Sequence, residues 1–217
     1  MKKIILSACM AILAITISFA QTSEGHIVYN VTVSSDNPEM EMVIDMMQDA
    51  NLEVYFKGHQ SYTLMSMGAM MTMKTIISDS GDVLMLMSGM MGSKAIKTTN
   101  KELEGAENDE EDVEVTLADG TKTIAGYECK KAIITTDGGS EVIFWYTDEI
   151  VAAAGNRGNM NGKIPGIALA FEADENGVSM TYSATTVTLS VDDSVFNMDV
   201  PAGYEVISFA DFTNLGM

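Results

Sequence analysis

Residues 61–88 read SYTLMSMGAMMTMKTIISDSGDVLMLMS, and this stretch decides the fold class. Side-chain character alternates with a period of two over 61–67, 71–78 and 82–88, which is typical of strands. Turn-forming residues (SDSGD) separate the last two runs. Strands joined by so few residues leave no room for a crossover helix, so the pattern predicts an antiparallel meander.

Similar runs extend on both sides of this stretch. They cover residues 25–34, 52–57, 93–99, 113–117, 121–125, 127–136, 140–147, 166–173 and 178–191. DGG at 137–139 and DENG at 174–177 join neighbouring runs as hairpin turns would. We therefore expect at least eight strands in one bent antiparallel sheet. Two segments, 101–114 and 152–166, are predicted to be loops because the first is acidic and the second is rich in glycine and asparagine.

A single helix is expected, over residues 38–50. Asp36 or Asn37 provides the cap, with Pro38 and Glu39 in the first turn. Four apolar residues then fall on one helical face: Met40, Val43, Ile44 and Met47. The predicted fold class is α+β, a large curved antiparallel sheet of half-barrel form with one clear helix packed on it.

The N-terminus has the pattern of a cleavable export signal. Lys2 and Lys3 precede an apolar stretch over 4–19, and Ser18-Phe19-Ala20 supplies small residues at the cleavage site. The stretch is shorter than the ~20 residues of a membrane-spanning helix. We expect a signal peptide over 1–20, one domain over 21–217, no transmembrane anchor after cleavage, and a periplasmic or secreted location.

The net charge and the lack of catalytic motifs in the sequence argue against several classes of function. The formal net charge of −19 disfavours binding to nucleic acid and to anionic lipid head groups. The two histidines, His26 and His59, have no metal-ligand spacing, and no nucleophile elbow or phosphate-binding glycine loop follows a strand. Cys129 has no histidine or arginine near it in sequence and is expected in the core. We expect a protein that is not an enzyme and needs no cofactor.

Methionine is concentrated in one part of the chain: of 19 residues, 13 lie between Met40 and Met91. Three M-x-M pairs occur on three neighbouring predicted strands, and a spacing of two places both members of a pair on one face. The predicted ligand-binding residues are these six and two from the helix: Met65, Met67, Met71, Met73, Met85, Met87, Met40 and Met47. We expect them to line one hollow, partly closed by the helix.

Other interpretations of the methionines remain open. Methionine also serves as an adaptable filler of ordinary cores. Thioethers are ligands for Cu(I), although such sites usually include histidine or cysteine as well. A surface for another envelope protein is a third possibility.

Five short motifs occur in a fixed order in the second half of the chain. They are TIAGYECKKA (123–132), FWYT (144–147), IPGI (164–167), DDSVF (192–196) and PAGY (201–204). Over residues 120–205 this order resembles the secreted bacterial family described as domain of unknown function 4412, and is similar to its GLPGLI-named relatives. The resemblance implies a lipoprotein-carrier-like (LolA-like) fold, a bent sheet whose hollow is covered by helices, and no established activity.

These observations together predict a periplasmic or secreted, non-enzymatic binding protein. The expected partner is an apolar small molecule or lipid moiety such as an acyl chain. A methionine-rich copper-binding protein and an envelope protein-interaction module are the alternatives.

Overall fold

The computed structural model describes residues 23–90, 92–106, 114–135, 141–151, 164–175 and 177–214. In these residues, twelve strands form one sheet that is not closed into a barrel. The strands are β1 (Glu24–Ser34), β2 (Asn51–Lys57), β3 (Gln60–Ser66), β4 (Met71–Ile77), β5 (Asp82–Gly89), β6 (Gly92–Thr99), β7 (Glu114–Ile124), β8 (Tyr127–Thr135), β9 (Glu141–Thr147), β10 (Ile167–Glu175), β11 (Val178–Thr188) and β12 (Glu205–Ile207). The predicted signal peptide lies outside the described residues, as do the turn at 137–139 and the loop at 152–163.

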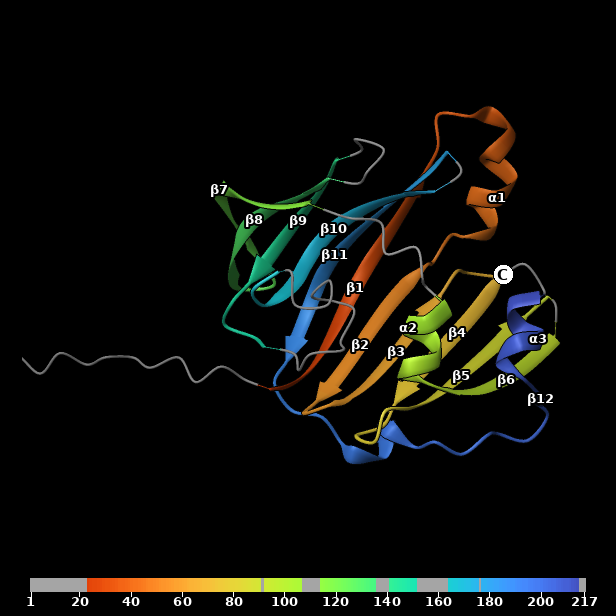
Figure 1. Ribbon diagram of the computed structural model, residues 1–217. Coiled ribbons are helices and arrows are strands. Elements are labelled where there is room, and N and C mark those ends of the chain that lie inside the picture. The colour runs from red at the N-terminus through yellow and green to blue at the C-terminus, as the bar shows by residue number, and fades with distance from the viewer. Residues whose placement is uncertain are drawn as a thin grey trace, which may run out of the picture.

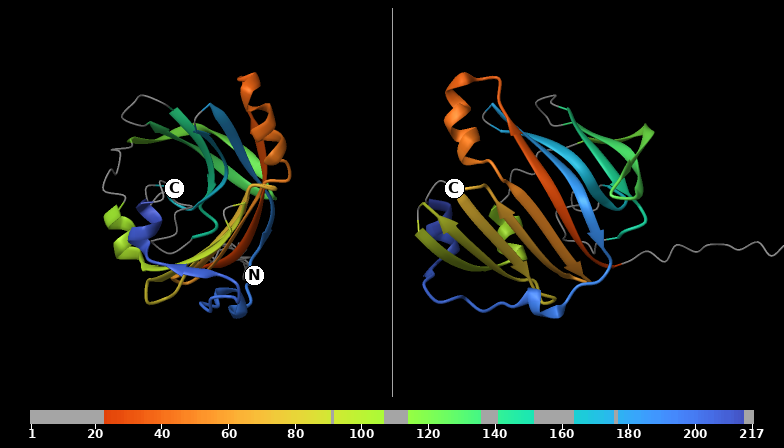
Figure 2. Two further views of the ribbon diagram at one scale, coloured as in Figure 1. Left: turned by 90° about the vertical axis from the view of Figure 1, so that its right-hand side faces the viewer. Right: turned by 180° about the vertical axis from the view of Figure 1, so that it is seen from behind.

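The strand order is β12-β6-β5-β4-β3-β2-β1-β11-β10-β9-β8-β7. Each paired neighbour is antiparallel except β12, which runs parallel to β6. The sheet bends strongly, with β7 and β12 at its two edges (Figures 1 and 2). The predicted bent antiparallel sheet is therefore confirmed, while the α+β class overstated the helical part because strands dominate the molecule.

The predicted helix over 38–50 is wrong in length. Asn37 accepts a hydrogen bond from the Glu39 amide, as expected of a cap, and begins a 3₁₀ turn η1 (Pro38–Met40) and a short helix α1 (Glu41–Met46). Asp49 adopts a left-handed conformation (φ 67°), which an α-helix does not continue through. α1 stands at the end of the strands and does not cover the concave face of the sheet (Figure 2).

Two helices that the sequence patterns did not predict lie on the concave side of the sheet: α2 (Asn100–Ala106) and α3 (Phe209–Asn214) (Figures 1 and 2). The solvated loop expected over 101–114 is therefore wrong for its first six residues. Thr99 accepts from the Glu102 amide while the Glu102 carboxylate accepts from the Thr99 amide, a reciprocal capping box. At the start of α3 the Ser208 hydroxyl accepts from the Asp211 amide and donates to the Asp211 carboxylate.

The motif segments form turns and parts of the core. Ala125 and Gly126 both have positive φ and join β7 to β8 as a tight hairpin. β7 itself is one strand with an irregularity between Ala118 and Thr121, where the sequence predicted two strands. A Cβ on Gly166 would collide with the Thr147 carbonyl, so only glycine fits this approach to β9.

Apolar side chains fill both faces of the sheet. On the concave face a large cluster joins β1 and β2 to β8, β10 and β11, with Phe56, Cys129 and Leu169 fully buried. On the convex face, Leu84 and Leu86 pack with Phe196 of η3 (Asp193–Phe196) and with the chain on either side of it. This C-terminal segment therefore covers the convex face of β3–β5. In the described part of the chain, no helix has the length and apolar character to cross a bilayer.

Candidate functional site

Three of the predicted methionines form one row across the sheet. Met65 on β3 lies opposite Met73 on β4, and Met73 lies opposite Met87 on β5. Directly opposite residues of antiparallel strands point to the same face. Leu52 extends the row on β2 and belongs to the concave core, so the row lies on the concave face.

The other strand methionines point the same way. Met71 precedes Met73 by two residues and Met85 precedes Met87 by two, so each shares the face of its neighbour. Met67 follows the end of β3, and its amide donates to the Met71 carbonyl across the β3–β4 turn. The sheet register and this turn therefore bring the six strand methionines to the concave side of β3–β5. We call them the methionine wall: Met65, Met67, Met71, Met73, Met85 and Met87.

A cavity of about 250 Å³ lies at the end of the methionine wall, beside the β3–β4 and β5–β6 turns. We call this cavity the rim pocket. It is lined by Met67, Met70, Met71, Met87, Ser88, Gly89, Met90, Gly92 and Lys94. Met65, Met73 and Met85 are not among these residues. The volume falls just below the ~300–1,000 Å³ of sites that enclose a drug-sized ligand. The rim pocket suits the end of a chain better than a whole large molecule.

The two helical methionines do not line the rim pocket. Met47 is 7% exposed, and the Met46 carbonyl accepts a hydrogen bond from the Ala69 amide in the β3–β4 turn. Gly68 in that turn lies so close to the Met46 and Gln48 carbonyls that a side chain there would collide with them. The backbone at the end of α1 thus holds the turn in place, and neither Met40 nor Met47 takes the predicted place in the lining.

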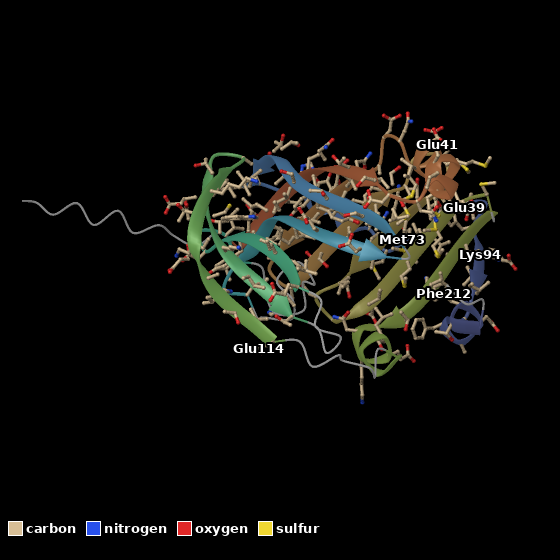
Figure 3. The ribbon with its side chains drawn as sticks, turned by 90° about the horizontal axis from the view of Figure 1, so that it is seen from above. Glu39, Glu41, Met73, Lys94, Glu114 and Phe212 are labelled. Carbon is tan, nitrogen blue, oxygen red and sulfur yellow. The ribbon has the colours of Figure 1, made fainter. Side chains whose placement is uncertain are left out.

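Lys94 adds one charge to the rim pocket, and its sequence context had not singled it out. It lies opposite Met87 on β6, and its Nζ is 3.1 Å from the Glu205 carboxylate on β12. Figure 3 looks onto this end of the sheet and labels Met73 and Lys94. Only the register, and not sequence spacing, reveals that Lys94 shares a face with the methionines.

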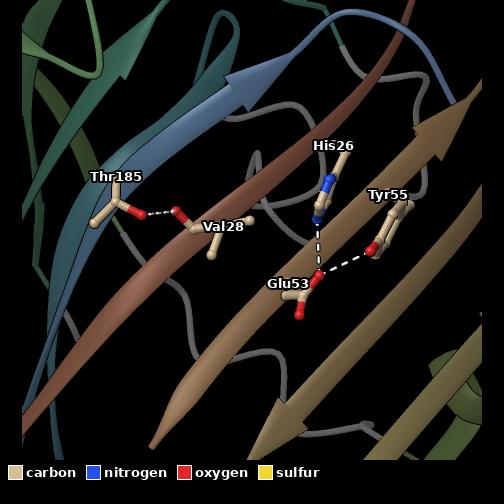
Figure 4. A network of polar contacts seen from close by, with 5 residues as sticks. All are labelled: His26, Val28, Glu53, Tyr55 and Thr185. Carbon is tan, nitrogen blue, oxygen red and sulfur yellow. Dashed lines mark hydrogen bonds and ion pairs between the residues drawn. The ribbon is translucent and has the colours of Figure 1, made fainter.

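The convex face carries a separate polar network (Figure 4). The Glu53 carboxylate contacts His26 Nε2 at 2.8 Å and accepts from the Tyr55 hydroxyl at 2.7 Å. His26 and Tyr55 stack with ring centroids 3.8 Å apart. Burial first, and then the hydrogen bond to Glu53, raises the pKa of Tyr55 to about 12. The network ties β1 to β2 and favours the neutral hydroxyl of Tyr55.

Cys129 lies in the concave core, as expected from its sequence context. Its side chain is fully buried, and this burial is the main cause that raises the pKa of the thiol to about 11. A thiol held neutral and away from solvent is a poor nucleophile.

The comparisons with known proteins give distant matches to solved structures. The chain is 16% identical to PNGF-II, covering 89% of this chain and 33% of that one with a TM-score of 0.49, so it spans about one third of PNGF-II. It is 8% identical to a beta-barrel-like protein of domain of unknown function DUF1849 from Brucella abortus (77% and 98% covered, TM-score 0.34). It is 11% identical to LprF from Mycobacterium bovis (79% and 88% covered, TM-score 0.34). No curated protein matches the sequence significantly.

A family model covers most of the sheet. The model for domain of unknown function DUF4412 matches residues 37–179, which include the methionine wall and the motif segments up to β11. This match spans more than half of the chain and includes three of the five motifs, while DDSVF (192–196) and PAGY (201–204) lie beyond it. The chain therefore belongs to the family of domain of unknown function DUF4412.

Proposed function

We propose that this protein works in the cell envelope, periplasmic or secreted, as a non-enzymatic binding protein for an apolar ligand such as an acyl chain. The observation that carries the proposal is the rim pocket, in which five of the nine lining residues are methionines. Thioether side chains are flexible and polarisable, so such a wall adapts to ligands of varied shape.

The energetics favour a simple chain. Each methylene transferred from water contributes ~0.8 kcal/mol to the binding free energy. A few methylenes in the rim pocket therefore make a favourable contribution, from which the costs of association are subtracted. The remaining methionines of the wall, Met65, Met73 and Met85, continue the apolar surface along the sheet for a longer ligand.

Titration with a fluorescent fatty acid tests this proposal. We expect saturable binding that Met67→Glu and Met71→Glu each weaken by about tenfold or more, because a buried carboxylate opposes an apolar chain. Met42→Glu is the matched control, since Met42 is 75% exposed on α1 and does not line the rim pocket.

Three results would contradict the proposal. Binding that persists in the Met67 and Met71 variants would place the ligand elsewhere. Absence of binding together with uptake of Cu(I) would favour the thioether metal site. Absence of both, with a stable complex formed with an envelope protein, would favour an interaction module.

A further inference from the structure

Lys94 is the one charged residue among those that line the rim pocket. Its side chain is 21% exposed and lies directly across from Met87, which is 7% exposed. The aliphatic stem of a lysine packs along apolar surface while its ammonium reaches outward. The rim pocket thus combines methionine walls with one positive end.

The ammonium already binds a carboxylate of the protein itself. Glu205 Oε2 lies 3.1 Å from Lys94 Nζ, but the Glu205 side chain is 71% exposed and comes from β12, a strand of only three residues at the sheet edge. An ion pair this open to solvent contributes little to stability. Another carboxylate can therefore replace Glu205 at small cost.

We propose that the ligand of the rim pocket is a fatty acid anion, with its chain among the methionines and its carboxylate on Lys94 in place of Glu205. This inference rests on the proposed function and specifies the ligand class. The net charge of −19 disfavours anions over most of the surface, so a local cation decides where an anionic head group binds. A carboxylate suits a single ammonium, whereas phosphate sites gather several donors such as backbone amides or a planar arginine fork.

Calorimetric titration of the purified protein with dodecanoate and with dodecanol, which share a chain length, tests the inference. We expect dodecanoate to bind about tenfold more tightly than dodecanol, the contribution typical of a hydrogen bond to a charged group. Lys94→Gln should abolish this difference by weakening dodecanoate binding. Glu205→Gln should tighten dodecanoate binding, because the internal competitor is removed.

Lys97→Gln is the matched control. Lys97 is on the same strand but three residues further on, so it points to the convex face and its loss should change neither affinity. Circular dichroism and thermal unfolding of each variant establish that the sheet is intact.

The outcomes separate the two proposals. Equal binding of both ligands, unaffected by Lys94→Gln, would overturn the fatty acid assignment and leave the apolar site standing. Tight binding of a single-chain phosphate monoester with no preference for dodecanoate over dodecanol would overturn the carboxylate assignment. Failure of both dodecyl ligands to bind the unaltered protein would overturn the proposed function itself.

Discussion

Met73 on β4 and Met87 on β5 are direct cross-strand partners, with their side chains on the concave face of the sheet. The pair links the rest of the methionine wall to the rim pocket, because Met87 lines that pocket and Met73 does not. An apolar surface therefore runs from the pocket toward the concave core, where Met65 packs. This continuity underlies the proposal that a chain-like ligand enters at the rim.

Gly166 provides a test of the fold. Its φ of 133° and the closeness of the Thr147 carbonyl both exclude a side chain, so Gly166→Ala should lower the free energy of unfolding by more than the ~1–3 kcal/mol of backbone strain alone. Gly177→Ala is the control, because Gly177 also has a positive φ but has open space around its Cα. Urea unfolding of both variants measures the difference; equal losses would contradict the close approach seen at Gly166.

Cys129 should be inert in the native protein. Burial keeps its thiol protonated with a pKa of about 11 and also blocks access. A thiol-reactive disulfide reagent should label it only as the protein unfolds, at a rate that follows denaturant concentration. Rapid labelling of the folded protein would contradict the buried position and reopen a chemical role for the residue.

Tyr55 should show a raised pKa that depends partly on Glu53. Its pKa of about 12 in the folded protein lies above the ordinary value of 10.0, so folding favours the neutral hydroxyl. The stability gained is fully present below pH 10.0 and is lost as the pH rises through about 12. Ultraviolet titration of tyrosinate should find a lower pKa in Glu53→Gln, whereas an unchanged titration curve would remove Glu53 as a cause.

Local patterns predicted the meander well because each strand of 61–88 has both a period of two and a marked turn. The register that joins Met65, Met73 and Met87 follows from these short turns. The sequence also contained capping boxes at Thr99–Glu102 and Ser208–Asp211, and reading them would have predicted α2 and α3. The parallel pairing of β12 with β6, which brings Glu205 to Lys94, depends on long-range packing that no local pattern reveals.

The most direct test of a ligand in the rim pocket is nuclear magnetic resonance of the protein with carbon-13-labelled methionine methyl groups. Each signal is assigned by a Met→Leu variant, and dodecanoate is then added. We predict progressive shifts of the Met67, Met71 and Met87 methyl signals, while exposed Met42 and Met198 of the convex cluster keep theirs. Shifts of Met42 and Met198 as large as those of the pocket residues, or no shift at Met67, Met71 and Met87, would contradict an apolar site at the rim.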